Sequence, residues 1–100
     1  MKTEFRTRTL RNQYEESKKA VKAYGPQVAR KYVERVNILK AARDQADVVA
    51  QRALRCHALK GRRQGQYGIR LLDRWRLIVT FRSENVEIVR IEEVSKHYDD

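Results

Sequence analysis

The sequence predicts an α+β fold, in which a pair of helices packs on one face of a small antiparallel β-sheet. Apolar residues recur at helical spacing between residues 10 and 43, with one break at Gly25-Pro26. From residue 67 onward the period changes, and apolar residues alternate with polar ones as they do in strands. Helices and a sheet that each carry one apolar side bury these sides against each other. The whole chain, residues 1–100, is expected to form a single domain of two layers.

The N-terminal part predicts one edge strand and two helices. Residues 1–8 are short and mixed, and they are expected to add a strand at the edge of the sheet. The first helix is expected over residues 10–24. Gly25 then suits a helix C-terminus and Pro26 suits the first turn of the next helix. The second helix is expected over residues 27–43, and so short a break predicts an antiparallel hairpin. The apolar stripes are Leu10, Tyr14, Val21 and Tyr24, then Val28, Ala29, Tyr32, Val33, Val36 and Leu39.

The C-terminal part predicts a short helical turn and a three-stranded meander. Asp47 is expected to cap a turn over residues 48–54. Strands are expected over residues 67–71, 75–82 and 86–91, because apolar and β-branched residues alternate there. Both connections are short enough for antiparallel hairpins. Asp73 lies in the first connection, and Ser83, Glu84 and Asn85 lie in the second.

The alternation within the strands also predicts a cationic sheet surface. Trp75, Leu77, Val79 and Phe81 form the natural core side of the middle strand. Side chains point to opposite faces in turn along a strand, so the intervening residues must face away from the helices. The residues expected on that free face are Arg76, Thr80 and Arg82, with Arg70 from the preceding strand.

The distribution of charge favours a polyanionic partner. The chain has 23 Lys and Arg against 13 Asp and Glu, a formal net charge of +10. Between Arg52 and Arg82 the only acidic residue is Asp73. Clustered arginines suit nucleic acid, because they release counterions from the phosphate backbone and offer planar, forked contacts. A solvated surface or an acidic protein partner would explain the same cluster. The candidate nucleic-acid contacts are Arg55, Arg62, Arg63, Arg70, Arg82 and Lys96.

The sequence is typical of a cytoplasmic protein. Its single cysteine, Cys56, cannot form an internal disulfide, which suits a reducing compartment. The N-terminus has no apolar signal core, and no run approaches the roughly 20 apolar residues of a membrane span. Cys56 stands beside His57, which could suggest a thiol nucleophile, but a small, partly buried side chain is the favoured interpretation.

The residue types present suit RNA cleavage without a metal. With two histidines and no cluster of cysteines or paired carboxylates, no metal site and no cofactor are expected. Cleavage at a phosphodiester needs a base for the 2′-hydroxyl, an acid for the leaving 5′-oxygen and cations for the phosphorane. Each candidate could also have a structural role, as a turn residue, a loop charge or a frayed end. The candidate catalytic residues are His57, Lys60, Arg76, His97 and Tyr98.

The run LRCHALKGRRQGQYGIRLLDRWRLIVTF, residues 54–81, resembles the centre of HigB-like toxins, also called plasmid maintenance system killer proteins, of the RelE/ParE superfamily. The shared features are a His-x-Leu-Lys-Gly segment, a Gly-x-Tyr-x-Ile strand and a Trp-Arg-Leu strand. The N-terminal helices and the end of the chain fit the same family. The resemblance implies a RelE-like fold and a toxin that enters the ribosomal A site and cleaves translated mRNA without metal. It also implies neutralisation by a cognate antitoxin, often a helix-turn-helix protein like HigA.

The resemblance assigns His57 and Lys60 to the His-x-Leu-Lys pair, and Arg76 to the strand arginine that contacts phosphate. Some HigB toxins end in Asp-Tyr-His, whereas this chain ends in Lys-His-Tyr-Asp-Asp, so the assignment of His97 and Tyr98 departs from that pattern. ParE-like toxins of the same superfamily poison DNA gyrase and are not nucleases, and fold alone does not separate the two activities. A plain basic RNA-binding module is a further alternative, but it leaves the histidine motifs without a role.

Overall fold

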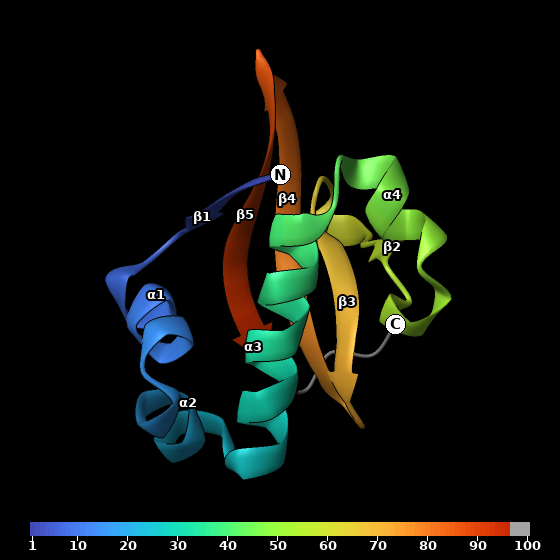
Figure 1. Cartoon of the computed structure of the whole chain (residues 1–100). Coiled ribbons are helices and arrows are strands. Elements are labelled where there is room, and N and C mark those ends of the chain that lie inside the picture. Colours follow the sequence, from blue (N-terminus) through green and yellow to red (C-terminus); the bar gives the residue numbers. More distant parts are fainter. Residues whose placement is uncertain (97–100) are drawn as a thin grey trace.

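A computed structural model describes residues 1–96, which form one five-stranded sheet with helices against one of its faces (Figure 1). The helices are α1 (Arg8–Glu15), α2 (Ser17–Tyr24), α3 (Pro26–Ala41) and α4 (Gln45–Ala50), with 3-10 turns η1 (Arg52–Leu54) and η2 (Gly61–Arg63). The strands are β1 (Lys2–Phe5), β2 (His57–Ala58), β3 (Tyr67–Leu72), β4 (Trp75–Glu84) and β5 (Val86–Ser95). The predicted α+β class is therefore confirmed.

The first predicted helix is two helices, because the chain becomes extended at Glu16 (φ −126°, ψ 99°). At 100° per residue, Leu10 and Ala20 would point about 80° apart on one continuous helix. The break allows both side chains to be buried in the same core. The Thr7 hydroxyl caps α1 by accepting a hydrogen bond from the Leu10 amide at 3.1 Å. The expectation of a single helix over residues 10–24 was wrong at this point.

The turn between α2 and α3 agrees with the prediction. Gly25 has a φ of 84°, and Pro26 occupies the first turn of α3. Figure 1 shows α2 leading into α3 through a short turn, and α3 lying in front of the sheet roughly along its strands. The Tyr32 hydroxyl, fully buried on α3, donates to the Leu10 carbonyl at 2.7 Å and ties the two parts of the helical layer together. Burial raises the pKa of Tyr32 well above its usual value.

Helix α4 is capped by Asp44, which corrects the prediction that Asp47 is the cap. The Asp44 carboxylate accepts a hydrogen bond from the Asp47 amide at 2.9 Å. The Asp47 carboxylate points back and accepts from the Arg43 amide at 3.0 Å. The two aspartates thus close the N-terminus of α4 together, and the helical segment begins earlier than residue 48.

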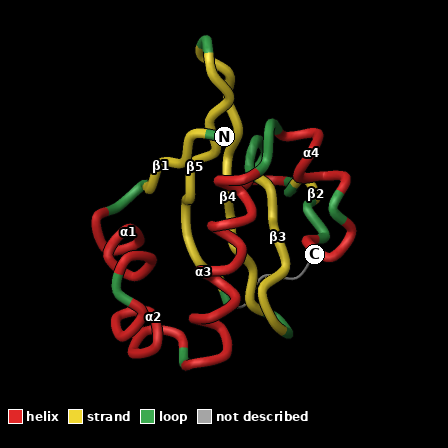
Figure 2. Tube along the Cα trace, in the orientation of Figure 1, coloured by secondary structure: helices red, strands yellow, loops and turns green. Residues whose placement is uncertain are grey.

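The sheet has the strand order β1-β5-β4-β3-β2, and it is mixed rather than purely antiparallel (Figure 2). β1 lies at the edge as expected, but it pairs parallel with β5, with Lys2 opposite Ile88 and Phe5 opposite Ile91. The other strand pairs are antiparallel. The Met1 ammonium donates to the Lys40 carbonyl at 2.8 Å and also to the Ala42 carbonyl. It thereby satisfies carbonyls at the C-terminus of α3, where a positive charge is favourable. β2 was not predicted.

The last two strands are longer than the sequence pattern indicated. β4 continues through Ser83 and Glu84, and only Asn85, with a φ of 64°, separates it from β5. β5 continues to Ser95, so Glu92 and Glu93 belong to the sheet and not to a tail. A bulge lies where Ile78 is opposite Glu93 and the next pair is Val79 with Ile91. Figure 1 shows the β4–β5 hairpin projecting beyond the rest of the sheet.

The core lies between the helices and one sheet face. Leu77, Val79, Val89 and Ile91 from the strands are buried against Tyr32, Val36 and Leu39 of α3. On the outer side of this helical layer, α2 and α3 leave a groove of about 650 Å³ that includes Val21, Arg30 and Val33. Within residues 1–96, no helix is long and apolar enough to cross a membrane.

Candidate nucleic-acid interface and active site

The open face is the sheet surface on the side away from α1, α2 and α3. Residues directly opposite each other on neighbouring strands share a face, so the register identifies its members. One cross-strand row contains Arg70, Arg76 and Ser95. The next contains His57, Gly68, Ile78 and Glu93, and a third contains Glu4, Thr80 and Arg90.

The middle of the open face is not the solvated cationic surface that the alternation predicted. Ile78 is 0% exposed and Leu59 is 4% exposed, and both lie outside the main core. Leu59 covers Gly68, where an added methyl group would lie 3.3 Å from its Cδ2 atom. Glu92 and Glu93 add two carboxylates to the face. The positive charge therefore surrounds a closed, partly apolar centre.

A compact loop over residues 59–66 covers this centre and presents basic side chains. The Leu59 amide donates to the Gln66 carbonyl at 2.9 Å, which closes the loop, and the buried Leu59 side chain anchors it. Arg63 Nη1 donates to Glu93 Oε1 at 2.7 Å and so fastens the loop to β5. Lys60 and Arg62 are exposed on this loop. Gly61 has a φ of 65°, a conformation that favours glycine.

His57 lies on β2 with its imidazole over Gly68. Its Nδ1 is 2.7 Å from the Arg55 carbonyl oxygen. Because a carbonyl oxygen only accepts, Nδ1 donates a proton in this contact, and Nε2 is the ring atom that can exchange one. Nε2 is buried, 3.5 Å from the position of a methyl group at Gly68. The ring must turn or its cover must open before a substrate meets this atom.

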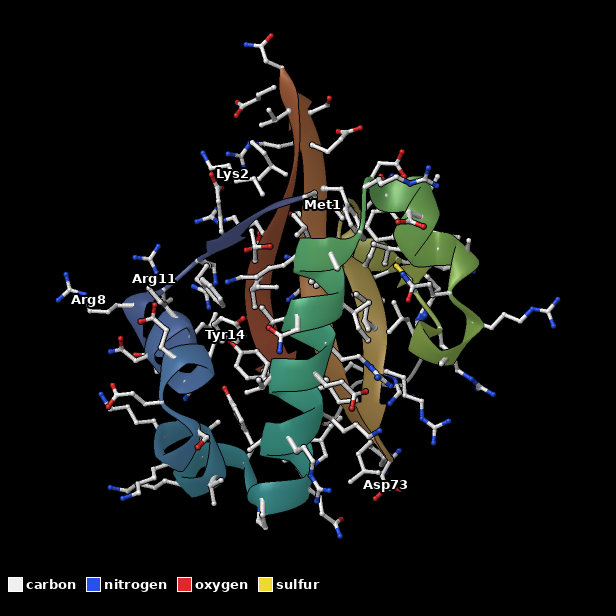
Figure 3. All side chains as sticks on the ribbon, in the orientation of Figure 1. Met1, Lys2, Arg8, Arg11, Tyr14 and Asp73 are labelled. Carbon is white, nitrogen blue, oxygen red and sulfur yellow. The ribbon has the colours of Figure 1, made fainter. Side chains whose placement is uncertain are left out.

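Arg76 and Arg70 are cross-strand partners near the β3–β4 turn. Arg76 Nη1 donates to the carbonyls of Asp73 at 2.6 Å and Trp75 at 3.0 Å, which fixes its guanidinium beside the turn. Figure 3 shows Asp73 at the tip of this hairpin, where its φ is 50°. The two arginines lie one row along the open face from His57, with β3 between the strands of His57 and Arg76.

The remaining predicted contacts differ in how far their charge is balanced. Arg82 makes two hydrogen bonds to Glu4, at 2.8 and 2.9 Å, and a third to Glu84 at 3.1 Å. The Arg82 hydrogen bonds lower the pKa of Glu4, and the two carboxylates raise the pKa of Arg82. Lys96 lies over the Trp75 ring, 5.7 Å from its centroid. Arg55 is exposed with a left-handed φ of 48°.

Two of the five candidate catalytic residues, His97 and Tyr98, lie outside the described residues. The other three, His57, Lys60 and Arg76, come from β2, the 59–66 loop and β4, which all meet on the open face.

The sequence pattern did not predict that four residues form a cluster on the open face: Arg6, Thr80, Arg90 and Glu92. Glu92 is 8% exposed, and its Oε2 accepts a hydrogen bond from the Thr80 hydroxyl at 2.8 Å. Arg6 Nε and Arg90 Nε lie 3.8 and 3.9 Å from its two carboxylate oxygens. The parallel pairing of β1 and the bulge in β5 create this cluster, and neither leaves a mark in the sequence pattern.

Cys56 is half-buried against the core, as the sequence analysis favoured. Burial raises the pKa of its thiol to about 11, so the thiolate is scarce at neutral pH. In the part of the chain that the structure describes, no three His, Cys, Asp or Glu side chains are grouped so that they could hold a metal ion.

The fold is shared with solved toxin structures. A YoeB/ParE toxin from Agrobacterium tumefaciens superposes with a TM-score of 0.67 at 16% identity, covering 98% of this chain and 100% of that chain. A chain of the YoeB-YefM complex from Staphylococcus aureus gives 0.60 at 18% identity, with 98% of each chain covered. This architecture thus defines a small RelE-like toxin fold.

A comparison of the sequence with protein families identifies the family. The family model for the RelE-like toxin of type II toxin-antitoxin system HigB matches residues 3–94, so the chain belongs to the HigB-like toxin family. Among curated proteins there is no significant match. The family resemblance found in the sequence is therefore confirmed, and the protein is a type II toxin.

Proposed function

We propose that this toxin is a ribosome-dependent endoribonuclease that cleaves translated mRNA without a metal ion and thereby stops protein synthesis. The observation that supports it most is that His57, the basic 59–66 loop and Arg76 share one open sheet face. This face offers a proton-transfer group beside cations that suit a phosphate. The toxin family to which the chain belongs supports the same activity.

The proposed reaction uses the RNA's own 2′-hydroxyl as the nucleophile. A base takes its proton while the 2′-oxygen bonds to phosphorus, and the bond from phosphorus to the 5′-oxygen breaks. An acid returns a proton to that 5′-oxygen. The products are a 2′,3′-cyclic phosphate and a 5′-hydroxyl end, so protons and bonds balance without another reactant.

Each proposed catalytic residue has a defined part in this reaction. His57 exchanges a proton through Nε2, because Nδ1 donates to the Arg55 carbonyl. Arg76 and Lys60 stabilise charge on the phosphorane, and Arg76 is held for this by two turn carbonyls. His97 and Tyr98 complete the proposed set. Arg55, Arg62, Arg63, Arg70, Arg82 and Lys96 are proposed to contact RNA phosphates around it.

We also propose that a cognate antitoxin, a helix-turn-helix protein like HigA, neutralises the toxin in the cytoplasm, where ribosomes are. One structure that shares the fold is a complex of YoeB with YefM. A net charge of +10 suits an acidic antitoxin as well as RNA.

Pulse labelling after expression of the toxin alone tests this function against the gyrase alternative. Incorporation of labelled amino acid should fall before incorporation of labelled thymidine, because the proposed target is translation. If DNA synthesis stops first and gyrase–DNA adducts accumulate, the toxin acts as ParE-like proteins do. If neither incorporation falls, both activities are contradicted and the RNA-binding alternative is favoured.

A further inference from the structure

Arginines on the open face fall into two kinds, according to which edge of the guanidinium is occupied. Arg82 donates from both terminal nitrogens to Glu4 and from its Nε to Glu84, so two carboxylates balance its charge. Arg6 and Arg90 instead turn their Nε edges toward Glu92. Their terminal NH₂ groups have no hydrogen-bond partner within residues 1–96, and the side chains are 51% and 42% exposed.

Glu92 holds Arg6 by a backbone hydrogen bond and attracts both guanidinium groups by charge, because its carboxylate oxygens lie 3.8 and 3.9 Å from their Nε atoms. Glu92 is buried, and its Oε2 accepts a hydrogen bond from the Thr80 hydroxyl. Its backbone carbonyl accepts a hydrogen bond from Arg6 Nε at 2.8 Å. The Arg6 amide bonds to the Ile91 carbonyl at 2.9 Å, so the residue is fixed against β5. Two guanidinium groups share the Glu92 carboxylate, and Glu4, which lies opposite Arg90, is hydrogen-bonded to Arg82. The outward NH₂ groups match the forked contacts that arginine makes with phosphate.

We propose that Arg6 and Arg90, paired with Glu92, form a phosphodiester-binding subsite on the open face, separate from the Lys60–Arg76 region. The inference rests on the proposed function, because it adds a contact to the same RNA-binding face. The subsite and His57 share the open face but lie near its two opposite edges, the subsite beside β1 and His57 on β2. A strand of RNA bound across the face contacts the sheet on both sides of the covered centre. The phosphates come from the mRNA or from ribosomal RNA.

The test measures salt-dependent binding of wild-type toxin and the Arg6→Gln/Arg90→Gln double variant. One arm uses a fluorescent, uncleavable 2′-O-methyl RNA oligonucleotide, and another uses vacant ribosomes. Each lost single-strand phosphate contact lowers the salt slope by about 0.7, which is about fivefold in Kd near ~0.1 M salt. The double variant should bind roughly 25-fold more weakly. Arg6→Lys/Arg90→Lys should recover most of the slope, because it retains the charge. Arg11→Gln/Arg30→Gln is the matched control, because it removes the same two positive charges from exposed positions on the helical layer.

The arms separate the sources of phosphate and the competing partner. Weaker binding to the oligonucleotide identifies mRNA as the source, and weaker binding only to vacant ribosomes identifies ribosomal RNA. Unchanged Kd and slope in both arms, with thermal unfolding also unchanged, overturns the subsite. A third arm measures binding to poly-glutamate. If the double variant loses affinity for poly-glutamate alone, the subsite is also overturned, and the pair binds an acidic protein instead. If wild-type toxin binds and cleaves while the double variant does equally well, only this inference fails. If wild type binds neither RNA probe, the proposed function fails with it.

Discussion

His57 shows how one backbone contact determines the chemistry that a side chain can offer. The Arg55 carbonyl engages Nδ1 at 2.7 Å, and Arg55 itself is held in a left-handed conformation by the turn after η1. The tautomer is thereby fixed, and Nε2 faces Gly68. Arg76 is oriented in the same way by carbonyls of its own hairpin. At this scale, backbone oxygens position the proposed catalytic side chains.

Cys56 provides a residue-scale prediction, because its thiol stands next to His57 in sequence but differs in environment. Burial raises its pKa to about 11, so alkylation by iodoacetamide should be slow at neutral pH and accelerate up to about pH 11. Cys56→Ser should leave mRNA cleavage near the wild-type rate. Rapid labelling at neutral pH together with an inactive serine variant would contradict this prediction and identify Cys56 as a nucleophile.

At the scale of elements, Gly68 leaves room on the open face for the imidazole of His57, its cross-strand partner on β2. A Cβ atom there would lie 3.3 Å from Leu59 Cδ2 and 3.4 Å from His57 Cε1. The absence of a side chain therefore makes room both for the ring and for the anchor of the 59–66 loop.

Gly68→Val should accordingly displace His57 and Leu59 without breaking the strand, because β-branched residues suit strands. Cleavage should fall by about the 10² to 10⁴-fold expected for loss of an acid–base group. Single-turnover rates and thermal unfolding measure the two effects. Ala58→Val, on the exposed neighbouring position of β2, is the control. Full activity in Gly68→Val would show that the ring position is not needed.

The Glu4–Arg82 pair joins β1 to the projecting β4–β5 hairpin, and its contribution should depend on pH. Hydrogen bonds from Arg82 lower the pKa of Glu4 in the folded state. A lowered carboxyl pKa stabilises the fold above the unfolded value of about 4.5, and this stabilisation is lost as pH falls through the folded value. The difference in Tm between wild type and Glu4→Gln should therefore be larger near about pH 7 than near about pH 3. An equal difference at both would contradict the pairing.

The same elements show what the sequence could and could not predict. Periodicity located α3, β3, β4 and β5, and the Gly25-Pro26 break was placed correctly, because these features are local. The break at Glu16 depends on where Leu10 and Ala20 meet the core, and the parallel pairing of β1 depends on a partner about 86 residues away. His57, Lys60 and Arg76 could be chosen from motifs. The Arg6–Arg90–Glu92 cluster could not, because only the tertiary register brings it together.

Over the whole molecule, positive charge lies on both layers, so total charge alone does not locate the RNA-binding surface. Figure 3 shows Arg8 and Arg11 projecting from α1 into solvent, far from the β3–β4 turn. The open face differs from that surface by combining arginines with His57, a tethered basic loop and oriented guanidinium groups. This combination is the physical basis for proposing a nuclease rather than a general polyanion binder.

Single-turnover cleavage of mRNA in a programmed ribosome, with and without EDTA, tests the central claim most directly. EDTA-treated wild-type toxin, added to ribosomes kept intact by polyamines, should cut mRNA and leave a 2′,3′-cyclic phosphate or its 3′-phosphate product. Arg76→Ala and His57→Ala should bind ribosomes with a Kd within about fivefold of the wild-type value while cleaving about 10² to 10⁴-fold more slowly. Near wild-type rates in both variants would contradict the proposed site, and loss of wild-type cleavage in EDTA on intact ribosomes would contradict the metal-free mechanism.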